Sequence, residues 1–249
     1  MDGEIEIGKG KFGRRAYGFD DVAIVPSRRT RDPQDIDISW QLDKFHFQLP
    51  VLASAMDGVV NPKIAIKLGK LGGLGVINLE GIQARYDNTD EVFERIAGLP
   101  KEEATRGLQE IYREPIKPEL IAKRVKEIKS QNVITAASLT PQRVEQYYKY
   151  ALEAGLDILI IQGTVVSAEH VSTIVKPLDL NNFISSLDIP VIVGGCCSYS
   201  TALHLMRTGA LAVLVGVGPG AACTTRQVLG LGVPQATAIS DAAAARTRH

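Results

Sequence analysis

The sequence predicts an α/β fold of the TIM (β/α)8-barrel type, of which about six βα units are present. Short apolar runs recur along the chain, helical stretches separate them, and their spacing is nearly even. Alternation of strand and helix produces parallel strands joined by right-handed crossovers, and a long series of such units is typical of a barrel. No Gly-x-Gly-x-x-Gly motif follows the first apolar run, which disfavours a Rossmann sheet.

The apolar runs are the expected strands. The runs at 158–161 and 191–193 are apolar at every position, as expected of parallel strands that are buried on both faces. The predicted strands span residues 50–54, 74–78, 133–138, 157–162, 190–195 and 211–216.

Helix signals lie between these runs. Asn61-Pro62 and Thr140-Pro141 are typical helix starts, and Gly155 and Gly209 are typical helix ends. The predicted helices span residues 62–71, 118–130, 141–154, 200–208 and 235–249. Residues 80–118 are polar, helical in parts and too long for a simple loop, so we interpret them as an elaborated connection within a single domain, 1–249.

Composition narrows the class of protein. The 249 residues carry 28 basic and 28 acidic side chains, and this zero net charge disfavours a nucleic-acid partner bound through its phosphates. No apolar stretch is long enough for a membrane span. Three cysteines, two of them adjacent, make neither a disulfide framework nor a metal-ligand pattern, so a reducing cytoplasm is the expected location.

The glycine-rich stretch after the last apolar run is the strongest functional signal. It reads Gly-Val-Gly-Pro-Gly-Ala-Ala-Cys-Thr-Thr-Arg over residues 216–226 and places Cys223 where the next helix should begin. The positive end of a helix dipole lowers a thiol pKa and makes it a better nucleophile. A glycine turn with a buried structural cysteine is the alternative, and local chemistry alone favours neither reading.

Four ordered motifs resemble the IMP dehydrogenase/GMP reductase family. They are the glycine loop with the following Gly-Val-Pro-Gln-Ala-Thr-Ala-Ile (232–239), Tyr-Gly-Phe-Asp-Asp-Val-Ala-Ile-Val-Pro (17–26), Ser-Ala-Met-Asp (54–57) and Leu-Gly-Gly-Leu-Gly-Val-Ile-Asn (71–78). The chain looks most like the IMP dehydrogenase-related branch of cyanobacteria and actinobacteria, in which a short connection replaces the regulatory CBS pair. Residues 80–118 would be that connection.

The resemblance implies a nicotinamide-dependent oxidoreductase of purine metabolism and GMP biosynthesis that acts at C2 of a purine nucleoside monophosphate. Cys223 would be the nucleophile and Thr225 its partner at the same carbon. Ser54 and Met56 would contact the nucleotide, and amides near Gly220 and Ala221 would hold its phosphate. The implied cation is K⁺, on the backbone carbonyls of Gly218, Gly220 and Cys223. NAD or NADP is the implied cofactor, and a homotetramer is the implied assembly.

The sequence also departs from the family pattern. Gln162 occupies the position at which dehydrogenases carry an aspartate that contacts ribose or nicotinamide. Gly195 occupies the position at which they carry an asparagine. We expect both positions to face the cofactor. Ala221 replaces a usual serine.

Family members continue through two further strands and a mobile flap, which we do not find before His249. We therefore expect unpaired edges on the first and last strands. The alternative function is a catalytically inactive, truncated member that serves as a structural subunit docked in a larger assembly.

Overall fold

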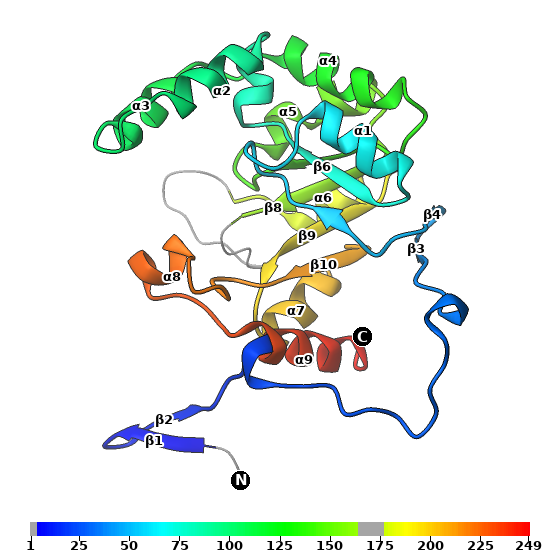
Figure 1. The fold of residues 1–249 in the computed structure, drawn as a ribbon, viewed down its shortest axis with the longest axis vertical. Helices are drawn as coiled ribbons and strands as arrows, with labels where there is room; N and C mark the ends of the chain where they lie inside the picture. Colours follow the sequence, from blue (N-terminus) through cyan, green and yellow to red (C-terminus); the bar gives the residue numbers. More distant parts are fainter. Residues whose placement is uncertain (1–3, 164–176) are drawn as a thin grey trace.

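The structure, a computed structural model, describes residues 4–163 and 177–249 (Figure 1). Its centre is a six-stranded parallel sheet in which the strands lie in sequence order, from β5 at one edge to β10 at the other. The strands are β5 (Leu52–Ala53), β6 (Leu74–Asn78), β7 (Ala136–Leu139), β8 (Ile158–Gln162), β9 (Val191–Cys196) and β10 (Ala212–Val215). All six predicted strands are confirmed, with boundaries that shift by up to three residues.

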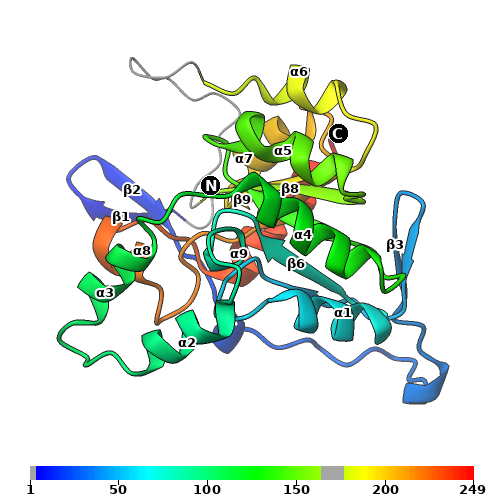
Figure 2. The same cartoon turned by 90° about the horizontal axis from the view of Figure 1, so that it is seen from above.

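Helices follow the strands as the βα alternation predicts. The helices of these units are α1 (Pro62–Lys70), α4 (Pro118–Lys129), α5 (Val144–Glu153), α6 (Leu180–Ser185), α7 (Tyr199–Met206), α8 (Thr224–Leu229) and α9 (Gln235–Arg246). Helices α1, α4 and α5 pack against one another in series along the sheet (Figure 2). Asn61 caps α1, because its Oδ1 accepts a hydrogen bond from the Ile64 amide at 2.9 Å. Helix α6 has no counterpart in the prediction.

The strands are buried on both faces, as their sequences predict. Along β8, Leu159 and Ile161 join a large core that includes residues of the covering helices, whereas Ile158 and Ile160 join a second core on the opposite face. The second core also receives Leu42 and Phe47 from a hairpin, β3 (Trp40–Leu42) and β4 (Phe45–Phe47). The structure therefore shows a curled sheet with helices outside and apolar side chains inside, which is a partial TIM barrel.

The N-terminal segment forms a second hairpin, β1 (Glu4–Gly8) and β2 (Lys11–Arg14), that stands away from the body of the molecule (Figure 1). Arg14 forms an ion pair with Asp241 of α9, and the Tyr17 amide donates to Thr237 Oγ1 at 2.8 Å. These contacts attach the start of the chain to the last helix. Neither hairpin was predicted from the sequence.

The connection at 80–118 holds a short 3-10 helix, η3 (Ile82–Ala84), and the helices α2 (Thr89–Ala97) and α3 (Ala104–Ile111). Ile82, Val92 and Ile111 form its small apolar core. The buried Arg124 of α4 donates to three backbone carbonyl groups of the connection, those of Gln83 (3.1 Å), Tyr86 (3.0 Å) and Asp87 (2.7 Å).

The two outer strands of the sheet have one strand neighbour each. Among residues 4–163 and 177–249, no strand pairs with the free side of β5 or of β10. Within the same ranges, no helix is both long enough and apolar enough to cross a membrane.

Candidate active site

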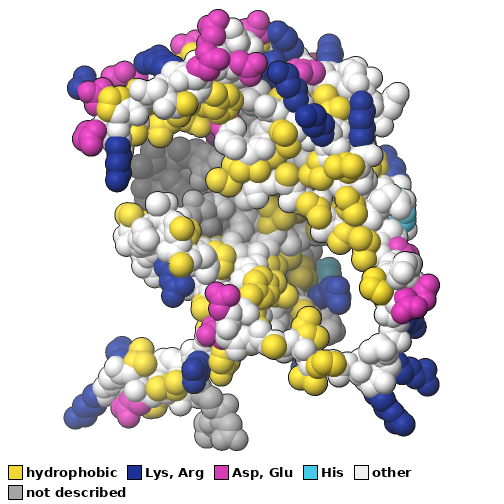
Figure 3. Space-filling model, viewed as in Figure 1, with side chains coloured by type: hydrophobic (Ala, Val, Ile, Leu, Met, Phe, Trp, Pro, Cys, Tyr) yellow, Lys and Arg dark blue, Asp and Glu magenta, His cyan; other side chains and the backbone are white. Residues whose placement is uncertain are grey.

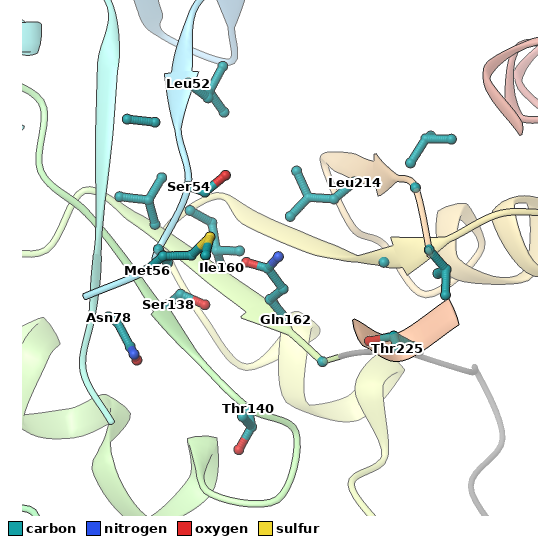
Figure 4. A pocket seen from close by; sticks show the side chains of 18 of the residues that line it. Leu52, Ser54, Met56, Asn78, Ser138, Thr140, Ile160, Gln162, Leu214 and Thr225 are labelled. Carbon is teal, nitrogen blue, oxygen red and sulfur yellow. The ribbon is translucent and has the colours of Figure 1, made fainter. Parts of the chain in front are cut away.

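A cavity of about 960 Å³ lies at the carboxyl ends of the parallel strands (Figure 4). Residues at or just after every one of the six strands line it, among them Ser54 after β5, Asn78 of β6, Ser138 of β7, Gln162 of β8 and Gly195 of β9. Barrel enzymes place their active sites at this end, because the loops after the strands converge there. Its size suits a drug-sized or nucleotide-sized ligand.

The cavity brings together most of the residues that the sequence analysis selected. Those that line it are Ser54, Met56, Gln162, Gly195, Gly218, Cys223 and Thr225. Gly220 and Ala221 lie in the same loop but do not line the cavity. Seven selected residues from four separate stretches of the chain therefore share one space.

The glycine loop between β10 and α8 is fixed by the segment that follows α8. The Val233 amide donates to the Val217 carbonyl at 3.0 Å, and Gln235 Nε2 donates to the Val215 carbonyl at 2.9 Å. Gly218 has a φ of +56°, and a Cβ there would lie 2.4 Å from the Leu231 carbonyl oxygen. Only glycine combines this backbone conformation with so close an approach. Residues 231–235 thus hold the start of the loop that carries Cys223.

Cys223 is the N-cap residue of α8, as its place before the predicted helix indicates. The Arg226 amide has the largest effect on the thiol and lowers the pKa of Cys223; the Thr225 amide and hydroxyl and the Arg226 charge act in the same direction. Burial opposes these contributions but does not outweigh them. Cys223 therefore has a larger thiolate fraction at neutral pH than an ordinary cysteine.

The other two cysteines differ from Cys223. Burial raises the pKa of Cys196 to about 11, and burial also raises the pKa of Cys197. Cys196 is fully buried in β9, as expected of a packing residue. Among the three thiols, Cys223 is therefore the one whose surroundings favour the thiolate.

The Ser-Ala-Met-Asp stretch follows β5, and its first three residues line the cavity. The Met56 carbonyl accepts hydrogen bonds from the amides of Val59 and Val60, both at 2.9 Å. Met56 is 59% exposed, although a methionine considered alone would be expected in the core. An exposed methionine beside a cavity is well placed to contact a planar ligand.

Sequence reasoning missed several polar residues of the cavity, namely Asn78, Glu80, Ser138 and Thr140. Glu80 is held in place because Oε1 accepts from the Thr140 amide and Oε2 lies 3.4 Å from Arg143 Nε. Each missed residue occupies or follows the carboxyl end of β6 or β7. Their position at the ends of predicted parallel strands is the feature of the sequence that could have identified them as cavity residues. In the part of the chain that the structure describes, no cluster of histidine, cysteine or carboxylate side chains could hold a metal ion.

Comparisons with known proteins identify the family of this chain. The sequence profile of the IMP dehydrogenase / GMP reductase domain matches residues 16–249. The chain is 47% identical over 248 residues to an uncharacterized oxidoreductase from Mycobacterium tuberculosis, covering 97% of this chain and 66% of the relative. It is 31% identical over 252 residues to the inosine-5'-monophosphate dehydrogenase of Borreliella burgdorferi, and the match covers 93% of this chain and 60% of that relative.

A solved structure is also similar. The crystal structure of an IMP dehydrogenase/GMP reductase-like protein from Corynebacterium glutamicum superposes with a TM-score of 0.92 at 42% identity, covering 98% of this chain and 65% of that one. The chain thus spans about two thirds of the length of its curated actinobacterial relatives. On the family match, the chain belongs to the IMP dehydrogenase/GMP reductase family.

Proposed function

We propose that this chain carries the catalytic centre of a nicotinamide-dependent oxidoreductase that acts at C2 of a purine nucleoside monophosphate. One observation carries the proposal: Cys223 has a lowered pKa at the start of α8 and lines the same cavity as Ser54 and Met56. A depressed thiol pKa is what covalent catalysis by cysteine requires. Membership of the IMP dehydrogenase/GMP reductase family supports the substrate class.

The chemistry begins when the Cys223 sulfur bonds to C2 of the purine. With GMP, the 2-amino group leaves as ammonia and a thioimidate remains; reduction at C2 then breaks the C–S bond and gives IMP. With IMP, oxidation at C2 gives the same thioimidate, which water hydrolyses to XMP. Thr225, the second residue of α8, would donate or accept a proton at C2 through its hydroxyl.

NAD or NADP would supply or accept the hydride when bound. Gln162 and Gly195 line the cavity on adjacent strands, and a Cβ on Gly195 would meet the Gly216 carbonyl oxygen at 2.6 Å, so this wall is formed by backbone. The Gln162 carboxamide can both donate and accept, which suits the carboxamide of a nicotinamide. Because Gln162 carries no charge where dehydrogenases use an aspartate, we favour the reductive direction, from GMP to IMP.

The proposal extends to a monovalent cation. The carbonyls of Gly220 and Cys223 each accept one backbone hydrogen bond, at 3.2 Å, which leaves a second lone pair on each oxygen. The Gly218 carbonyl lies against Gly232, where a Cβ would approach it to 2.6 Å. If these oxygens bind K⁺, activity rises when K⁺ replaces Li⁺ at constant ionic strength.

The test is turnover by the full-length protein, followed at 340 nm with GMP plus NADPH and separately with IMP plus NAD⁺. We expect oxidation of NADPH in the first assay and its loss in Cys223→Ser. Turnover with IMP plus NAD⁺ alone would show that the enzyme works in the oxidative direction, from IMP to XMP. Absence of turnover with both pairs would contradict the proposal and support the alternative, a catalytically inactive subunit.

A further inference from the structure

We propose that Tyr112, in the 80–118 connection, is a positioning residue for the nucleotide-binding stretch 54–57 and acts through Asp57. The inference rests on the proposed function, because it assigns Ser54 and Met56 to nucleotide binding. The structure supplies the link as a series of hydrogen bonds between two segments that are far apart in the sequence.

One carboxylate oxygen of Asp57 accepts two hydrogen bonds from the 80–118 connection. Its Oδ2 accepts from the Tyr112 hydroxyl at 2.5 Å and from the Ile82 amide at 2.9 Å. Its Oδ1 lies 3.5 Å from Asn78 Nδ2 at the end of β6. Hydrogen bonds to a charged carboxylate are stronger than neutral ones, so these contacts restrict where Asp57 can lie.

The backbone of the connection is shaped to admit this carboxylate. A Cβ on Gly81 would lie 2.0 Å from Asp57 Oδ1 and 2.1 Å from Oδ2. Any side chain at position 81 would therefore displace Asp57. The fit between Gly81 and Asp57 shows that the two segments are built against each other.

Tyr112 is itself held by its surroundings. Arg85 donates from Nε to the Glu80 carbonyl at 2.9 Å and also donates to the Glu114 carbonyl, so it spans the base of the connection. The Arg85 guanidinium lies 5.7 Å from the centre of the Tyr112 ring. The phenol is thus placed by α3 and Arg85, and it reaches Asp57 in a fixed direction.

Asp57 directly follows Met56, so the carboxylate determines how the preceding residues meet the cavity. The Met56 side chain is exposed, so burial does little to fix its conformation. Without the Tyr112 hydroxyl, Asp57 keeps the Ile82 amide but loses its side-chain donor from the connection. Residues 54–57 would then sample more conformations in the free protein. Nucleotide binding would have to order them, and the lost conformational entropy would weaken the affinity.

The phenol remains a donor throughout the working pH range. Burial raises the pKa of Tyr112, and the hydrogen bond and charge of Asp57 raise it further. A raised phenol pKa keeps the proton on oxygen at neutral and mildly alkaline pH. The effect of removing the hydroxyl should therefore be the same at pH 7 and pH 9.

The experiment compares Tyr112→Phe with Tyr150→Phe in the full-length protein. Tyr150 on α5 is 41% exposed, against 39% for Tyr112, and lies outside the cavity lining, which makes it a matched control. Calorimetry with GMP should show affinity weakened about five- to tenfold in Tyr112→Phe and unchanged in Tyr150→Phe. In the steady state, KM for GMP should rise while kcat stays within about twofold.

A double-mutant cycle and hydrogen exchange complete the test. If Tyr112 acts through Asp57, then Asp57→Asn should weaken GMP binding, and adding Tyr112→Phe to it should cost less than Tyr112→Phe alone. The amides of Val59 and Val60, which bond to Met56, should exchange faster in free Tyr112→Phe. Unchanged GMP affinity and exchange in Tyr112→Phe would overturn the inference. Failure of the wild type to bind GMP or IMP would overturn the proposed function itself, and this inference with it.

Discussion

At the residue scale, the surroundings of Cys223 could be predicted from the sequence. Its place after a glycine loop and before a helix predicts an N-cap position and a lowered pKa, and the structure shows both. The sequence could not show that Gly220 and Ala221 would lie outside the cavity lining. The direction in which each residue of a tight loop faces depends on its φ and ψ angles, which the amino-acid sequence alone does not specify.

Cysteine reactivity tests this assignment without any substrate. At pH 7.5, iodoacetamide should alkylate Cys223 at least about tenfold faster than Cys196 or Cys197, because thiolate is the reactive form. As pH rises, the Cys223 rate should reach its half-maximum below the ordinary thiol pKa, since a lowered pKa places the thiolate at lower pH. Cys196, with a pKa of about 11, should react only at higher pH.

Peptide mass spectrometry at timed intervals measures the three rates. Cys223→Ser should abolish the fast phase, and Cys197→Ser should leave it intact. Fast labelling of Cys197 in place of Cys223 would contradict the assignment of the nucleophile.

At the element scale, the sequence predicts the buried strands well because their signal is strong. Residues 158–161 are apolar at every position and become β8, covered on both faces. The hairpins β1–β2 and β3–β4 were missed because neither contains a continuous buried apolar run: every residue of β1 is exposed, and β3 and β4 bury one residue each. Such strands depend on pairing and on turns, such as the one at Asp43 with a φ of +53°, more than on buried apolar area.

The 80–118 connection could be located from its polar sequence, but its attachment could not. Arg124 is 7% exposed and looks in the sequence like an ordinary charged residue of an amphipathic helix. Its guanidinium satisfies three carbonyls of the connection, which a pattern of apolar residues cannot reveal. The same holds for the bond between Tyr112 and Asp57.

Replacement of Arg124 tests how the connection is attached. Arg124→Lys should lower the free energy of unfolding by about 1–3 kcal/mol, because lysine lacks the planar fork of donors and leaves buried carbonyls unpaired. Chemical denaturation measures the change. Arg95→Lys on α2, where the arginine side chain is 58% exposed, is the matched control and should change stability by less than about 0.5 kcal/mol. Equal effects of the two substitutions would show that the Arg124 contacts do not hold the connection.

At the scale of the whole molecule, the strand order and the cavity follow from the βα alternation. Parallel strands in sequence order bring their carboxyl ends to one side, so residues separated by more than a hundred positions line one space. The motifs in the sequence pointed to residues in separate parts of the chain, and seven of these residues line the cavity. It could not predict the size of the cavity, which depends on how strongly the sheet curls.

Apolar side chains also gather on the face shown in Figure 3. In the N-terminal segment, Ile24 is 97% exposed and Val25 is 85% exposed. Both belong to the stretch at residues 17–26 that resembles the family.

The central claim is that Cys223 bonds to C2 of a purine nucleotide, and a covalent adduct tests it most directly. The full-length protein is incubated with GMP alone, and separately with IMP plus NAD⁺, then quenched in acid and weighed by mass spectrometry. We predict an added mass equal to GMP less ammonia in at least one sample, located on Cys223 by peptide mapping, absent from Cys223→Ser and retained in Cys197→Ser. Turnover of a purine nucleotide with no adduct on Cys223, or an adduct that persists in Cys223→Ser, would contradict the claim.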